Sequence, residues 1–289
     1  MVLKHDHNGA DRQGAAPARP AGEQSGAWNV FVVGVKERER IQLTRNEEEE
    51  FTLDPAWRPG TKIAFSQADC EGCPASLLVI DPDSRVAARV RSRLGSFIDP
   101  AWAPGGHEVG ATRPGFGLYR IGVRSGITHR LTHGRTDGRP TWSPDGKRVA
   151  FERQVSPTNW DIYVTSAAGG KAVPLMRTPA QETSAAWSPD GRRIAFARQG
   201  KNGNWTIHVV RPDGGGDHRL TAIERSSQQP AWSPDGSRIA YLDQSGGGGS
   251  VMVMRSSGGR PLRLTANSMQ ANRPTWSPDG TRIAFAARR

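Results

Sequence analysis

Short apolar segments and turn residues alternate along residues 28–289, and the unit 184–223 shows the pattern most clearly. Residues 184–187 and 193–197 read as two strands joined by Ser188-Pro-Asp-Gly191, whose residue types suit a tight hairpin turn. In the second strand Ile194 and Phe196 alternate with alanines, as in a strand with one large apolar face. Residues 205–210 and 218–221 supply two more short strands. The unit therefore predicts four antiparallel strands.

The same unit recurs along the chain. Its marker is a tryptophan, and successive copies lie 45, 40, 45, 45 and 44 residues apart: Trp57, Trp102, Trp142, Trp187, Trp232 and Trp276. Four copies open the pentapeptide Trp-Ser-Pro-Asp-Gly, whereas the second reads Trp102-Ala-Pro-Gly-Gly106. A period of this length with four strands per repeat is typical of a β-propeller blade.

The two ends of the repeat array complement each other. The last repeat, about 273–289, holds only two strands, and residues of about 28–44 hold two strands that match the third and fourth of a blade. Pairing these halves would close the ring and remove exposed sheet edges. We therefore predict an all-β, six-bladed propeller of four-stranded antiparallel blades over 28–289, preceded by a disordered tail at 1–27 that is rich in Gly, Ala, Pro and charge.

The element Trp-Ser-Pro-Asp-Gly-x-x-Ile-Ala-Phe, with Leu-Thr about ten residues before each tryptophan, resembles the TolB-type propeller repeat. The resemblance covers residues 28–289, and related repeats also occur in propeller domains of prolyl-oligopeptidase-like enzymes. It implies a binding module of the bacterial cell envelope with a protein partner, and an extracytoplasmic location (periplasm or secreted). This chain shows no signal peptide, so a cytoplasmic location stays open. We expect a monomer without membrane insertion.

The formal net charge is +11, and the tail contributes none of it because its three bases and three acids cancel. A basic balance is compatible with an anionic partner, nucleic acid included. The competing interpretation is protection of sheet edges by bases in the expected outermost strands. Those bases are Lys36, Arg38, Arg40, Arg85, Arg89, Arg91, Arg93, Arg130, Arg219 and Arg263.

Motifs of known chemistry do not appear in the sequence. Gly-x-Ser-x-Gly, His-Glu-x-x-His and phosphate-binding Gly-x-x-x-x-Gly-Lys are missing, so no catalytic residue and no cofactor is predicted. Cys70 and Cys73 cannot complete a four-ligand zinc site and form either a local disulfide or an ordinary loop. His208 and His218 on neighbouring strands could form a two-histidine patch, but we favour surface histidines and predict no metal site.

The repeated aspartates of the turns, Asp145, Asp190, Asp235 and Asp279, are explained by turn chemistry, with the nearby arginines balancing their charge. Positions that vary between repeats carry more information. The residue three before each tryptophan is Asp54, Asp99, Arg139, Ser184, Gln229 or Arg273. Loops between the second and third strands should reach the same face of the propeller. Partner contacts are accordingly predicted at this channel mouth, locally basic, through Arg113, Arg139, Ser184, Lys201, Gln229 and Arg273.

The sequence thus favours a non-catalytic propeller that recognises a protein or peptide at one channel mouth. One alternative is a propeller hydrolase or lyase, or the propeller of a prolyl-oligopeptidase-like enzyme without its catalytic domain. A second alternative is the binding of a polyanion or nucleic acid through the basic surface.

Overall fold

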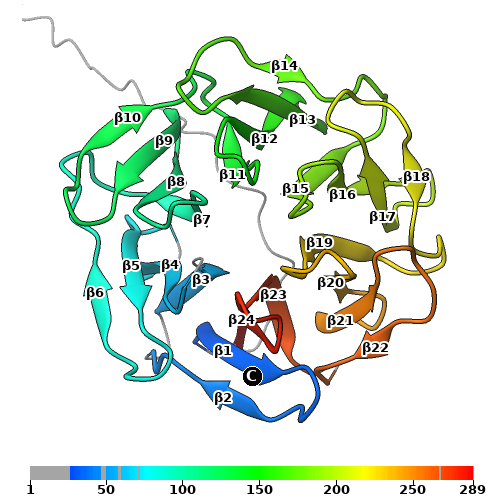
Figure 1. Cartoon of the computed structure of the whole chain (residues 1–289), viewed down its shortest axis with the longest axis horizontal. Helices are drawn as coiled ribbons and strands as arrows, with labels where there is room; N and C mark the ends of the chain where they lie inside the picture. The colour runs from blue at the N-terminus through cyan, green and yellow to red at the C-terminus, as the bar shows by residue number, and fades with distance from the viewer. Residues whose placement is uncertain (1–26, 47–49, 58–59, 71, 267, 289) are drawn as a thin grey trace, which may run out of the picture.

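The computed structural model describes residues 27–46, 50–57, 60–70, 72–266 and 268–288, so the predicted tail lies outside the described residues except for Ala27. Six four-stranded antiparallel sheets form from these residues and are arranged in a ring around a central axis (Figure 1). We number the sheets as blades 1 to 6 in the order of their inner strands. The predicted six-bladed propeller is confirmed.

The blades have these strands. Blade 1 contains β3(Phe51–Trp57), β4(Ile63–Ala68), β5(Ser76–Ile80) and β6(Ala87–Arg89). Blade 2 contains β7(Ile98–Trp102), β8(Glu108–Arg113), β9(Gly117–Gly122) and β10(Thr128–Arg130). Blade 3 contains β11(Gly138–Trp142), β12(Arg148–Ser156), β13(Asn159–Ser166) and β14(Val173–Pro174).

Blade 4 contains β15(Glu182–Trp187), β16(Ile194–Gln199), β17(Trp205–Val210) and β18(His218–Arg219). Blade 5 contains β19(Ser227–Trp232), β20(Arg238–Asp243), β21(Ser250–Arg255) and β22(Leu262–Arg263). Blade 6 contains β23(Gln270–Trp276), β24(Arg282–Arg288), β1(Asn29–Gly34) and β2(Arg40–Gln42).

Blade 6 joins the two ends of the chain. Its strand order is β2-β1-β24-β23, and β1 pairs with β24 over six residue pairs, from Asn29 opposite Ala287 to Gly34 opposite Arg282. Phe31 and Phe285 face each other in this register, and their rings stack with centroids 5.8 Å apart. Figure 1 shows the blue N-terminal strands beside the red C-terminal ones. The ring therefore closes without an open edge between the first and last blades.

The apolar core lies between the blades. At the junction of blades 3 and 4, Ile162 packs with Trp187, Ile194 and Phe196 in one buried cluster. The six repeat tryptophans are buried in such clusters, so they are packing residues. The Leu-Thr pairs anchor the outer strands. Leu43, Leu131 and Leu264 are buried and Leu220 is half-buried. Each threonine hydroxyl accepts a hydrogen bond from a third-strand N–H, at Thr44, Thr132, Thr221 and Thr265.

The Ser-Pro-Asp-Gly turns behave as predicted. In blade 5 the Ser233 hydroxyl donates to Asp235 Oδ1 at 2.5 Å and accepts from the N–H of Arg238 at 2.9 Å. Gly236 has a φ of 69°, which its lack of a side chain permits. The aspartates therefore serve the turns themselves.

The outer strands carry only part of the predicted basic edge. Five of the predicted bases lie in these strands: Arg40, Arg89, Arg130, Arg219 and Arg263. The others, Arg85, Arg91 and Arg93 as well as Lys36 and Arg38, lie in flanking turns because the outer strands are only two or three residues long. Within the described residues, no helix is long and apolar enough to cross a membrane.

Candidate functional site

Six equivalent residues of the inner strands share one unusual backbone conformation. Asp54, Asp99, Arg139, Ser184, Gln229 and Arg273 all have a positive φ, between 51° and 58°. A β-bulge accompanies each of them, because the pairing of every inner strand with its neighbour shifts register at this point. The repeat therefore builds a ring of six left-handed residues around the channel.

This conformation is strained for residues with a side chain. Glycine would adopt it freely, and a non-glycine residue there costs about 1–3 kcal/mol. None of the six residues is glycine, although the chain places glycine at many other positive-φ positions. All six positions therefore carry a side chain in a strained conformation, and such residues cluster at functional sites.

Four of the six predicted partner-binding residues come together. Arg139, Ser184, Gln229 and Arg273 line one cavity of about 170 Å³ in the channel. Arg113 and Lys201 are not among its lining residues. Arg113 lies at the end of β8 with its guanidinium 4.0 Å from the centre of the Phe116 ring, and Lys201 is exposed in the loop between β16 and β17.

Arg273 links three blades through its side chain. Its Nε lies 3.0 Å from Asp54 Oδ1 and its Nη2 lies 2.8 Å from Asp99 Oδ1. The two carboxylates are 13% and 10% exposed. Burial raises the pKa of Asp54 because the attraction of Arg273 offsets it only in part. For Asp99 burial also opposes ionisation, but Arg273 and Arg139 outweigh it and lower the pKa.

Arg139 is held more loosely. Its Nη1 lies 3.4 Å from Glu152 Oε1, and its side chain is 39% exposed to the channel. Glu152 raises the pKa of Arg139 against the opposing effect of burial, so the guanidinium stays charged. This is the more exposed of the two channel arginines, and its donors are suited to carboxylates.

Side chains also accept hydrogen bonds from backbone N–H groups of ring residues in the following blade. Gln229 Oε1 accepts a hydrogen bond from the N–H of Arg273 at 2.6 Å, and Glu152 Oε1 accepts one from the N–H of Ser184 at the same distance. Thr112 joins the two arginines and three acids into one polar network, because its hydroxyl accepts from the N–H of Arg139 at 3.1 Å and donates to Asp99. The predicted basic character of this mouth is offset by these acids.

Glu152 was not predicted from the sequence as a site residue, although a comparison of the repeats distinguishes it. The residue after the Ile-Ala-Phe element is Ser66, Thr112, Glu152, Ala197, Leu242 or Ala286, so position 152 carries the one charge among six equivalent positions. Thr112 shows the shared role of this position, since its hydroxyl donates to Asp99 Oδ2 at 2.9 Å. A comparison of the repeats at this position would have found Glu152.

The histidines and cysteines considered as candidate site residues contact residues of their own blade. His208 Nδ1 lies 2.9 Å from Asp217 Oδ1, while His218 pairs with Val209, so the two histidines alternate to opposite faces of the blade. Cys70 and Cys73 form a disulfide in the loop between β4 and β5. In the described part of the chain, no group of three or more His, Cys, Asp or Glu residues could hold a metal ion.

Solved structures with the same architecture include proteins of several functions. A putative TolB from Agrobacterium tumefaciens superposes with a TM-score of 0.78 at 20% identity, covering 92% of this chain and 99% of its own. TolB from Acinetobacter baumannii gives 0.65 at 17% identity, covering 90% of this chain and 63% of its own. An oligogalacturonate lyase in complex with manganese gives 0.57 at 14% identity, covering 88% and 70%. At these identities the likeness shows the fold alone.

Sequence comparisons point to one family. An uncharacterized peptidase of Bacillus subtilis, YuxL, is 25% identical over an alignment that covers 47% of this chain and 27% of the peptidase. The chain therefore spans about a quarter of the length of that curated relative. The family model of the TolB beta propeller domain matches residues 133–289, more than half of the chain, from the end of blade 2 to the closing strand. The chain belongs to the TolB beta propeller domain family.

Proposed function

We propose that this propeller is a non-catalytic binding module that recognises a protein or peptide segment at the channel mouth formed by Arg139, Ser184, Gln229 and Arg273. The observation that carries the proposal is the ring of six strained, non-glycine residues. The backbone is the same at all six positions, but the side chains differ. A rigid frame that presents different side chains to one opening is suited to recognition.

Arg139 is the principal contact in this proposal. It is the more exposed of the two channel arginines, and its bond to Glu152 is long at 3.4 Å, so its guanidinium can bind a partner carboxylate without leaving the network. Arg273 instead fixes the geometry, because Asp54 and Asp99 already occupy its guanidinium. Arg113 and Lys201 would contact the partner farther from the channel axis.

An extracytoplasmic location is part of the same proposal. The Cys70–Cys73 disulfide supports it, because disulfides persist in oxidising compartments such as the periplasm. Membership of the TolB beta propeller domain family also supports a protein partner.

The test blocks the channel cavity with a larger side chain. Ser184→Arg places a long side chain in the cavity, and arginine already adopts this backbone conformation at Arg139 and Arg273. Cross-linked pull-downs from the native host, read by mass spectrometry, should capture a protein with the wild type and lose it with Ser184→Arg. Arg139→Gln should weaken the same capture while leaving the bond between Glu152 and Ser184 in place.

Ser257→Arg is the matched control. Ser257 is exposed in the loop between β21 and β22, at the opposite end of the strands, so the same substitution there should leave the capture unchanged. Equal capture by Ser184→Arg and the wild type, with both proteins folded, would refute recognition at this mouth.

A further inference from the structure

A second feature of the repeat lies at the opposite end of the strands. At four blade junctions, an arginine at the start of a second strand, or directly before it, covers the tryptophan of the following blade. Arg148 lies 4.7 Å from the ring centre of Trp187. The equivalent pairs are Arg193 over Trp232 at 4.9 Å, Arg238 over Trp276 at 4.7 Å and Arg282 over Trp57 at 5.4 Å. These arginines fill the space between adjacent blades.

Blade 2 breaks this pattern. Where its second strand should begin with an arginine, it has Glu108, which turns to Arg120 of its own blade at 3.4 Å. The tight turn before it has Ala103 and Gly105 in place of the serine and aspartate of the other turns. Lys62 occupies the same position in blade 1. The two junctions that flank blade 2 therefore lack the arginine found at the other four.

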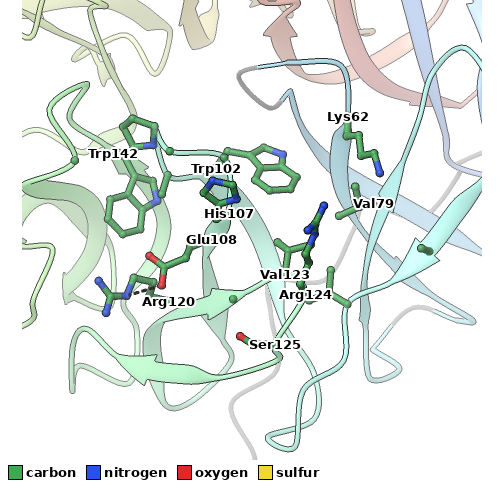
Figure 2. A pocket seen from close by; sticks show the side chains of 18 of the residues that line it. Lys62, Val79, Trp102, His107, Glu108, Arg120, Val123, Arg124, Ser125 and Trp142 are labelled. Atoms are coloured by element: carbon green, nitrogen blue, oxygen red, sulfur yellow. Dashed lines mark ion pairs between the residues drawn. The ribbon is translucent and has the colours of Figure 1, made fainter.

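A groove of about 1010 Å³ opens at these two junctions. It runs from the outer strand of blade 1, past Trp102, to Trp142 and the Asp145–Gly146 turn of blade 3. Figure 2 shows Glu108 directed towards Arg120, with Lys62 and Val79 on the far side of Arg124. Because its lining turns join first to second and third to fourth strands, the groove lies on the face opposite the channel mouth.

The charges of the groove are unbalanced. Lys62, Arg89 and Arg124 line it, are exposed, and have no ion pair with any residue that the structure describes. Of its acids, Glu108 pairs with Arg120, whereas Asp81 and Asp145 accept hydrogen bonds from the neutral Asp83 N–H and Ser143 hydroxyl and keep their charge. The lining thus holds four basic and three acidic residues, a net charge of +1, and three of the bases are free to bind an anionic ligand.

The groove also has an aliphatic wall. Val86 is 68% exposed, the highest fraction among the exposed large hydrophobic residues of the described chain, and the buried Val79 and half-buried Val123 also line the groove. A partner that covered Val86 with an apolar side chain would remove this surface from water.

We infer that this groove binds an extended acidic peptide segment in which carboxylates alternate with apolar side chains. The carboxylates would meet Lys62, Arg89 and Arg124, and the apolar side chains would pack on the wall formed by Val79, Val86 and Val123. The span across three blades is suited to a chain rather than to a single small anion. An anionic oligosaccharide would satisfy the cations but would leave the exposed Val86 uncovered. A peptide is therefore the ligand that contacts both the cations and the aliphatic wall.

The test measures fluorescence anisotropy of a short dye-labelled peptide in which glutamate alternates with leucine. Reversing the three cations with Lys62→Glu, Arg89→Glu and Arg124→Glu should weaken binding by about tenfold or more, because attraction becomes repulsion at three places. The matched control reverses Arg192, Arg255 and Arg260, which are exposed outside the groove, and should retain the wild-type affinity. Val86→Ser, which removes no charge, should also weaken binding.

Comparison peptides test the contributions of the cations and of the aliphatic wall separately. Replacing the glutamates with lysine should abolish binding, and replacing the leucines with serine should reduce it. Circular dichroism and thermal melting check that every variant is folded. The inference is overturned by equal binding to the groove and control triple variants, by binding of the serine peptide as tight as that of the leucine peptide, or by preference for oligogalacturonate over the peptide. Because Ser184→Arg leaves this groove intact, the outcome is independent of the channel proposal.

Discussion

Glu152 accepts a hydrogen bond from the N–H of Ser184 at 2.6 Å, although the two residues belong to different blades. The same carboxylate faces Arg139 of its own blade at 3.4 Å and is 5% exposed. One buried acid thus fixes the relative position of two blades and orients the arginine of the channel. The network therefore has both a structural and a recognition role.

Removing this acid should destabilise the propeller. Glu152→Ala leaves the Ser184 N–H without an acceptor and the Arg139 charge without its partner, at a cost of about 2–3 kcal/mol. For a domain of this size, each kcal/mol lowers the melting temperature by about 2–4 °C. Differential scanning calorimetry should show the loss. Glu152→Gln keeps an acceptor for the Ser184 N–H and should lower the melting temperature less. An equal decrease in both variants would mean that this hydrogen bond contributes nothing to stability.

Ser184 offers a direct measure of the strain in the ring. With φ at 58°, Ser184→Gly relieves the clash of the side chain with the backbone, while the greater freedom of glycine in the unfolded chain offsets part of the gain. We expect the free energy of unfolding to rise by about 0.5 kcal/mol, measured by urea titration. Ala185→Gly, one residue later and outside the positive-φ set, should instead lower it. A lower free energy of unfolding for Ser184→Gly than for the wild type would show that the conformation of Ser184 is not strained.

The sequence predicts the fold because each blade repeats the same local chemistry. The Trp-Ser-Pro-Asp-Gly turns and the alternating second strands are local patterns, and their spacing alone determines six blades. Ring closure also follows, because the two partial repeats complement each other at β1 and β24. None of these inferences requires knowledge of contacts between distant side chains.

The polar network of the channel could be predicted only in part. Comparing repeats identifies the six ring positions but not their partners, because Arg273 meets Asp99 across 174 residues of chain. The arginines after the turns were interpreted as balancing the aspartates, whereas Arg148 lies over Trp187 of the next blade. Local sequence proximity favoured the first interpretation, and the packing between blades determines the second.

The turn aspartates should make the protein sensitive to acid. Hydrogen bonds from the Ser233 and Ser277 hydroxyls lower the pKa of Asp235 and Asp279 from 3.8 to about 2. Since the folded pKa lies below the unfolded value, the stabilisation is complete above pH 3.8 and is lost as the pH falls through about 2. The difference in unfolding midpoint between the wild type and Asp235→Asn/Asp279→Asn should shrink over this window. A difference that stays constant down to pH 2 would contradict the assignment.

Blade 2 has glycine where the other blades have alanine in the second strand, and we expect this glycine to be required by Trp142. A Cβ on Gly110 would lie 2.9 Å from Trp142 Nε1, and the indole cannot retreat because it is buried and donates to Ala101 O at 3.1 Å. Gly110→Ala should therefore destabilise the fold by about 1–3 kcal/mol through overpacking. Chemical denaturation followed by tryptophan fluorescence measures this change.

Gly105→Ala in the neighbouring turn is the matched control, because the nearest atom to its new Cβ would be His107 Cδ2 at 4.0 Å. It should leave the stability within about 0.5 kcal/mol of the wild type, as surface substitutions usually do. Removing the ring with Trp142→Leu in the Gly110→Ala background should abolish the steric part of the cost. If Gly110→Ala costs as much with leucine at position 142 as with tryptophan, the close approach of the indole is not the reason for the glycine.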